Sequence, residues 1–243
     1  MGDNFYLLSV LPALPEFGGE PPLTPGELRE HAQVGRGTAA LVETVLLSDD
    51  LLQRQAYLAG EIKEVEPNVL SVGQVKGEAS LPVYLETQEE AGGAGGPMAG
   101  VDRLWEAYFR QGAAVGRRQG SGFLRAWVGY EVGLRNALAR ARAKALELDA
   151  AGYLVATDLA GEEDFGRLLS EWQVAETPLA GLELLDRARW QWLAENDAYF
   201  SFSDDELGAY AAKLMLLVRW RRMQRAARQM AQGEGPAEAG PTT

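Results

Sequence analysis

The chain has 243 residues, of which 47% are hydrophobic and 24% are charged, a composition typical of a folded globular protein. Its formal net charge of −12 at pH 7 disfavours generic binding to nucleic acid, because contacts to phosphate groups need an excess of Lys and Arg. The absence of cysteine and the single histidine, His31, exclude disulfides, thiolate metal sites, cysteine nucleophiles and metal sites with two imidazoles, and we expect no cofactor.

The first part of the chain predicts an apolar start followed by helices. Residues 4–15 are apolar but contain two prolines, so we expect a short extended or turn segment that lies on the core. The run Thr-Pro-Gly-Glu at 24–27 matches a capping box with proline at the first helical position, and it predicts a helix that ends near Gly35. The spacing of leucine and valine predicts two further helices, at 38–47 and 48–58.

The middle of the chain is rich in glycine and proline. Residues 61–85 suit either an irregular connection or a short hairpin, and the pattern leaves both alternatives open. A glycine-rich spacer at 91–100 and a hinge-like stretch at 116–122 lie on either side of a short amphipathic helix predicted at 101–111. Neither glycine-rich stretch matches a phosphate-binding motif, so we interpret both as linkers.

The second half of the chain predicts long helices. Residues 123–148 form the longest amphipathic segment without proline, and we expect a central helix there. Further helices are predicted at 162–172 and 182–200. The run Ser-Asp-Asp-Glu at 203–206 predicts a capping box that begins the last helix, and residues 233–243 have the composition of a disordered tail.

This succession predicts an all-α, bundle-like protein. We expect residues 1–232 to form a single helical domain, with the alternative of two helical lobes hinged near 91–122. No apolar run reaches the roughly 20 residues that a membrane span needs, and no signal peptide opens the chain. The expected location is therefore the cytoplasm.

Polar residues interrupt the apolar faces of the predicted helices at 123–148 and 182–200. Glu131 lies four residues before Arg135 and can pair with it along one helix face, next to Asn136. Asp186 and Arg189 form a second cluster three residues apart. The carboxylates could serve as a general acid and base, as in a small hydrolase. We favour an ion-pair network that fixes the register of the helices, because buried charges in helical proteins are usually paired for structure.

Basic residues are concentrated near the C-terminus. The sequence has no acidic residue between Leu207 and Gly233, and the last helix carries a run of arginines in this interval. This run suits a binding surface for the acidic loops of a partner or for anionic lipid headgroups, with a solvated helix end as the alternative. The candidate partner-binding residues are Arg219, Arg221, Arg222, Arg225 and Arg228.

Parts of the sequence resemble a known family. Residues 123–155 and 185–220 resemble a bacterial family of uncharacterised proteins encoded alongside subunits of V-type ATPases, and residues 4–15 are similar to the start of that family. The more specific marks are two dipeptides, Arg135-Asn136 and Arg189-Trp190.

The resemblance implies a subunit of the C (d-like) class of V/A-type ATPases. Such a subunit is an all-helical, non-catalytic element of the central stalk that joins the rotor shaft to the proteolipid ring. The implied partners are the shaft subunits and this ring, with peripheral contact at the cytoplasmic face of the membrane and without a nucleic acid, metal or small-molecule substrate. The chain is shorter than the better-known C subunits. A peripheral assembly or regulatory factor of the same complex is the alternative, followed by the carboxylate-dependent hydrolase.

Overall fold

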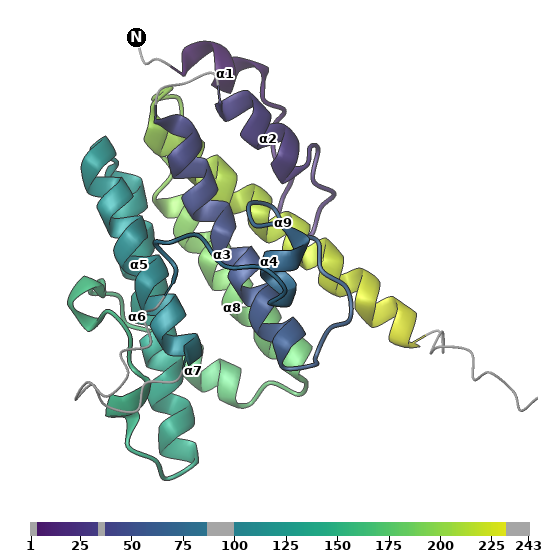
Figure 1. Ribbon diagram of the computed structural model, residues 1–243, viewed down its shortest axis with the longest axis vertical. Helices are drawn as coiled ribbons and strands as arrows, with labels where there is room; N and C mark the ends of the chain where they lie inside the picture. The colour runs from purple at the N-terminus through teal and green to yellow at the C-terminus, as the bar shows by residue number, and fades with distance from the viewer. Residues whose placement is uncertain (1–3, 34–36, 87–99, 232–243) are drawn as a thin grey trace, which may run out of the picture.

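The computed structural model describes residues 4–33, 37–86 and 100–231, and in these ranges every regular element is a helix (Figure 1). The α-helices are, in chain order, α1 (Phe5–Val10), α2 (Pro25–Ala32), α3 (Thr38–Leu58), α4 (Val72–Lys76), α5 (Gly100–Gln119), α6 (Gly122–Ala145), α7 (Gly166–Gln173), α8 (Pro178–Glu195) and α9 (Asp204–Ala231), and two short 3₁₀ helices, η1 (Ala150–Tyr153) and η2 (Thr157–Leu159), follow α6. The all-α, bundle-like prediction is confirmed. The predicted tail at 233–243 lies outside the described residues.

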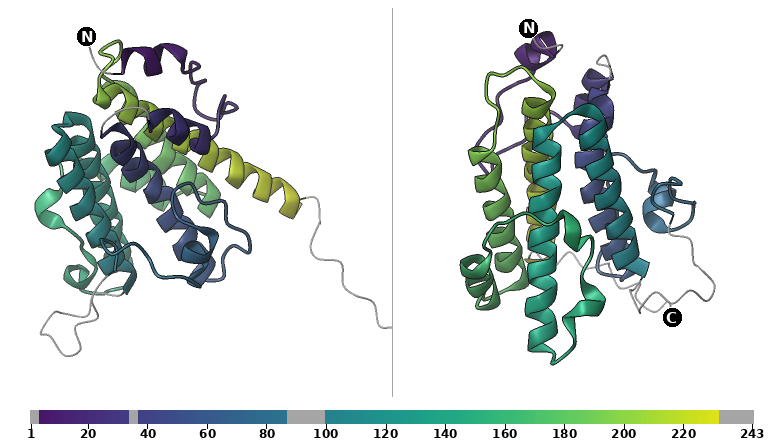
Figure 2. Two further views of the ribbon diagram at one scale, coloured as in Figure 1. Left: turned by 45° about the horizontal axis from the view of Figure 1, so that its top comes forward. Right: turned by 90° about the vertical axis from the view of Figure 1, so that its left-hand side faces the viewer.

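The long helices lie side by side, with α1 across one end of the bundle (Figures 1 and 2). α9 packs against α3, α6, α8 and α2, while α5 pairs with α6 and also contacts α3. Leu214, Leu216 and Leu217 of α9 are fully buried although they point in different directions around the helix. A helix that is apolar on nearly all sides is surrounded by other elements. α9 therefore shares the centre of the bundle with α6, the central helix predicted from the sequence.

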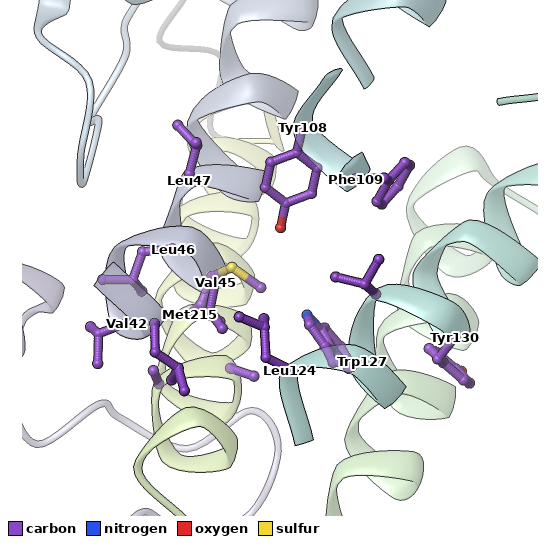
Figure 3. Close-up of a cluster of buried hydrophobic side chains, with 14 of the residues drawn as sticks. Val42, Val45, Leu46, Leu47, Tyr108, Phe109, Leu124, Trp127, Tyr130 and Met215 are labelled. Atoms are coloured by element: carbon purple, nitrogen blue, oxygen red, sulfur yellow. The ribbon is translucent and has the colours of Figure 1, made fainter. Parts of the chain in front are cut away.

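The core is one contiguous hydrophobic cluster with side chains from both sides of residues 91–122. Figure 3 shows Val45 of α3, Tyr108 of α5, Trp127 of α6 and Met215 of α9 converging in it. Trp127 also packs its ring 5.5 Å from that of Trp192 on α8. Aromatic pairs at this spacing stabilise a core beyond the area that they bury.

α3 is one helix, and the prediction of two helices at 38–47 and 48–58 was wrong. Ser48 and the two aspartates that follow favour a helix start in isolation, because their side chains can bond to backbone N–H groups. In the structure the Ser48 hydroxyl instead donates to the carbonyl of Val45 at 2.9 Å. The aspartates have partners outside the helix, so the backbone continues through them.

The hinge predicted at 116–122 is mostly helical, and residues 120–121 alone form the short turn of a helical hairpin. α5 runs to Gln119, eight residues beyond its predicted end, and α6 begins at Gly122. Ser121 caps α6, because its hydroxyl accepts from the backbone N–H of Leu124 at 3.0 Å. A Cβ at Gly116 would lie 2.9 Å from Cγ of Arg125, so this glycine permits close packing of α5 on α6.

Residues 61–85 form an irregular connection and not a hairpin, which decides between the two predicted alternatives. Their one regular element is α4, begun by a capping box between Ser71 and Gln74. The capping box predicted at 24–27 is confirmed in α2. α8 begins at Pro178, four residues earlier than predicted, because Thr177 caps it and proline suits the first helical position.

Replacing Gly208 with alanine should destabilise the fold. An added Cβ would lie 2.6 Å from Cδ1 of Phe123 and 2.9 Å from Cδ2 of Leu41, where α9 crosses α6 and α3. We expect the free energy of unfolding to fall by about 1–3 kcal/mol, since overpacking outweighs the better helix propensity of alanine. Chemical denaturation measures the change. Gly73→Ala is the control, because its Cβ would meet only Ala79 at an ordinary 3.6 Å, and equal stability of the two variants would contradict the close crossing.

Candidate functional site

A group of four buried or half-buried charged side chains joins three helices, and we call it the charge cluster: Glu131, Asp186, Arg189 and Arg219. Arg189 of α8 donates from Nε to Oε1 of Glu131 at 2.7 Å and from Nη2 to Oε2 at 3.0 Å, a bidentate bond to α6. Asp186 accepts from Nη1 of Arg189 at 3.1 Å. It also accepts from Nη2 and Nε of Arg219 on α9, at 2.5 and 3.2 Å. The four groups form a chain in which acid and base alternate.

The surroundings of Arg189 in the charge cluster favour its charged form. Burial alone would lower the pKa of the Arg189 guanidinium, but the adjoining carboxylates of Glu131 and Asp186 outweigh it and raise that pKa above its ordinary value. Two carboxylates and two guanidinium groups compensate one another, which the burial of four charges requires. The predicted ion pairing of Glu131, Asp186 and Arg189 is present, and their role in fixing the register of the helices stays a prediction.

Arg135 and Asn136 lie outside the charge cluster, and the predicted pair between Glu131 and Arg135 does not form. Arg135 donates to Asp102 of α5 at 3.0 Å, and its guanidinium carbon lies 4.8 Å from the ring centroid of Trp105. Asn136 accepts from and donates to the backbone of Val155, at 2.9 and 2.8 Å. Side chains four residues apart on α6 thus turn to different neighbours, because α8 and α5 lie on different sides of it.

The arginine run is largely used within the molecule. Arg219 is buried in the charge cluster and does not lie on the basic surface that the sequence predicts. Arg222 donates to both carboxylate oxygens of the buried Asp49 on α3, at 2.8 and 3.0 Å. Arg221 and Arg225 pair at the surface with acids of the loops before α2 and before α4, each at 3.0 Å. Arg228 is exposed and makes no ion pair with any described residue.

A buried carboxylate on α3 holds the irregular connection in place. Asp50 accepts three backbone N–H groups, from Asn68, Val69 and Leu70, each at 2.7 Å. Burial raises the pKa of Asp50 to about 6, against the lowering effect of these three hydrogen bonds. Sequence reasoning missed this site. The one available signal was the pair of aspartates within the apolar run Leu46–Leu52.

A groove of about 680 Å³ lies between α3, α5 and the segment after α4. Leu51, Leu58 and Leu104 contribute apolar walls. Three of its polar side chains already have internal partners: Nε1 of Trp105 donates to Gln55 at 3.2 Å, and Arg54 donates to the carbonyl of Gln74. No member of the charge cluster lines this groove.

The candidate acid and base of a hydrolase, Glu131 and Asp186, are both bound by guanidinium groups. Within the described ranges no group of three or more His, Cys, Asp or Glu side chains could hold a metal ion. No helix found there has both the length and the apolar character needed to cross a membrane.

Arg135→Ala should lower the free energy of unfolding by about 1–2 kcal/mol, because it removes a partly buried ion pair and a cation–π contact together. The measurement is denaturation by urea. Arg167→Ala removes an ion pair with Glu171 at the solvent-exposed surface of α7 and should leave the stability close to that of wild type. Equal effects of the two substitutions would mean that Arg135 does not join α6 to α5.

Comparisons of the chain with protein-family models, with curated proteins and with solved structures find no match in any of the three.

Proposed function

We propose that the chain is a non-catalytic, central-stalk subunit of a V/A-type ATPase, of the C (d-like) class, that couples the rotor shaft to the membrane proteolipid ring. The observation that carries the proposal is the structural role of the residues that mark the sequence resemblance.

Three of the four marking residues join α6 to another part of the molecule, and the fourth, Trp190, packs its ring 5.8 Å from that of Phe17. Arg135 bonds to α5, Asn136 bonds to the segment before η2, and Arg189 bonds from α8 to Glu131. A subunit that transmits torque needs helices that keep their positions under load, and close-packed interiors transmit strain. Residues that fix helices against one another support a mechanical role better than a catalytic one.

The exposed end of α9 is the proposed contact with the ATPase. Arg228 lies there together with Arg225, whose ion pair with Glu66 is exposed to solvent. Both lie beyond the arginines that form ion pairs inside the molecule. This end suits acidic loops of the shaft or anionic headgroups beside the ring, on the cytoplasmic side of the membrane.

The test is co-purification of the tagged chain with the shaft subunits and the proteolipid ring at moderate salt. We expect the wild-type chain to be retained and the double variant Arg225→Glu/Arg228→Glu to be lost. Arg167→Glu, a charge reversal at an exposed site on α7, is the matched control and should be retained. Failure of the wild-type chain to associate at any salt concentration would reject the proposal.

A peripheral assembly or regulatory factor of the same complex is the second candidate. It is favoured by the internal ion pairs of Arg219, Arg221 and Arg222, which leave Arg225 and Arg228 as a small basic surface that suits a transient contact. Quantification of subunits in the purified complex distinguishes the two. One copy per stalk supports the central-stalk subunit, whereas binding to assembly intermediates alone supports the factor.

A further inference from the structure

The segment that precedes α2 lies on the outside of the bundle, and we call residues 4–23 the N-terminal strap. In Figure 1 it runs from α1 along the bundle to the start of α2. From residue 5 onward, each of its residues keeps part of its surface exposed to solvent. All backbone–backbone hydrogen bonds described for it join residues of the strap itself. Side-chain contacts therefore hold the strap on the helices.

The strap meets α8 and α9 at a group of aromatic and basic side chains, which we call the strap surface: Arg187, Trp190, Tyr210, Trp220 and Arg221. The ring of Phe17 lies 5.8 Å from that of Trp190 and 5.5 Å from that of Trp220. The guanidinium carbon of Arg187 lies 5.2 Å from the centroid of the same Phe17 ring. Tyr210 donates to the carbonyl of Pro12 at 2.8 Å, and Arg221 pairs with Glu20 at 3.0 Å. The strap surface thus combines aromatic rings with positive charge.

Apolar side chains of the strap face the bundle at every third residue. Leu11, Leu14 and Phe17 are half-buried and pack against the hydrophobic core, and Pro12 and Pro15 lie between them in the sequence. A polyproline II helix has three residues per turn, so this spacing gathers the three apolar side chains on one face of an extended backbone. Leu11 has φ −68° and ψ 133°, values of this conformation.

The length of the strap matches the length of the surface below it. Pro12 and Phe17 lie five residues apart and span about 16 Å at the polyproline II rise of about 3.1 Å per residue. Their partners on α9, Tyr210 and Trp220, lie ten residues apart and span about 15 Å along that helix. The strap and α9 therefore run side by side in the same direction, and the strap surface suits an extended segment.

The contacts of the strap favour its detachment as a unit. A polyproline II backbone is fully solvated, so lifting it from α9 leaves no backbone group without a partner. Segments with few fully buried side chains and a solvated backbone open locally while the rest of a protein stays folded. The fully buried side chain of the strap is that of Asn4, which donates to Asp204 at 2.5 Å. Detachment would uncover Trp190 and Trp220 and leave the helices in place.

We propose that the strap surface binds an extended, proline-containing segment of another protein, and that the strap occupies this surface as an internal competitor. The segment has an apolar residue at every third position, the last of them aromatic, followed by a carboxylate that pairs with Arg221. Proline-rich segments bind aromatic surfaces in this way because their preformed backbone loses little entropy on binding. A second copy of the chain is a poor source, since its own strap is docked and each copy carries a net charge of −12. The strap surface binds such a segment whether or not the chain belongs to an ATPase.

The test measures the fluorescence anisotropy of a labelled synthetic peptide that has the sequence of residues 8–22. The full-length variant Phe17→Ser lacks the ring that anchors its own strap. We expect this variant to bind the peptide about tenfold more tightly than the wild-type chain does, because the tethered strap competes in the wild type. The control is Val83→Ser, which removes a side chain that is 84% exposed elsewhere and should bind as the wild type does.

A second peptide, with serine in place of Leu11, Leu14 and Phe17, keeps the prolines and the charge and should bind neither chain. Equal binding of the two peptides, or equal affinity of the variant and the wild type, would overturn the proposal. So would dimerisation of the wild-type chain in sedimentation experiments that Phe17→Ser abolishes, since the occupant would then be a second copy. If Phe17→Ser lowers the melting temperature of the whole bundle, Glu20→Arg takes its place with the same expected result. This change opposes Arg221 at a side chain that is 79% exposed, so the core stays intact.

Discussion

Asp186→Ala is expected to lower the free energy of unfolding by about 3–5 kcal/mol. The side chain of Asp186 is 5% exposed and accepts hydrogen bonds from two guanidinium groups, those of Arg189 and Arg219. Its removal leaves Arg219 buried without a counter-charge, and an unpaired buried charge costs more than the pair contributed. Urea denaturation at pH 7 measures the loss.

A matched substitution on the same helix separates burial from loss of charge. Glu183 pairs with Arg187 on the exposed side of α8, so Glu183→Ala removes one carboxylate and one ion pair at the surface. The expected cost is about 0.3–0.5 kcal/mol. If both variants lost a similar amount, the charge cluster would not be what holds α8 against α6 and α9.

The stability contributed by Asp50 is expected to decrease as the pH rises from about 4 to about 7. Burial raises its pKa in the folded protein to about 6 from the ordinary value of 3.8, so the folded state binds more protons between these values. The contribution is fully present below about pH 4 and is lost as the pH rises through about 6. The expected loss for this group is on the order of 2–3 kcal/mol.

The measurement is the difference in free energy of unfolding between wild type and Asp50→Asn at several pH values, because asparagine resembles the protonated acid. This difference should decrease as the pH rises. Its change with pH tests the prediction and its absolute value does not, because asparagine also changes the hydrogen bonds to the backbone at 68–70. Asp158→Asn is the control, because Arg110 lowers the pKa of that exposed carboxylate and the slope should have the opposite sign. If this difference instead increased with pH, the three backbone hydrogen bonds would outweigh burial in setting the pKa of Asp50.

Local signals were enough to place most helices. The capping box at 24–27 and the long apolar stripe of α6 depend on residues within a few turns of one another, and the structure confirms both. The same local reasoning failed at Ser48, where a favourable helix start is overridden by burial inside a longer helix. It also failed at 116–119, where glycine serves close packing of two helices and not flexibility.

Charge partners could not be predicted, because they depend on which helices lie side by side. Glu131 had a plausible partner four residues away, yet it bonds to Arg189, which is 58 residues distant. Arg222 looked exposed in a basic run, but its partner Asp49 is 173 residues distant. Spacing along one helix gives every possible local pair, and only the packing of α8 and α3 against their neighbours selects among them.

The position of α9 between earlier helices has a consequence for synthesis of the protein. The hairpin of α5 and α6 can pair as soon as both helices leave the ribosome, because a short turn connects them. α3, α6 and α8 share α9 as a neighbour, and it is the last of the described helices to be made. Until then their inner faces remain in contact with water. The core is therefore completed only after α9 has been made, and before that the nascent chain presents apolar surfaces of the kind that chaperones bind.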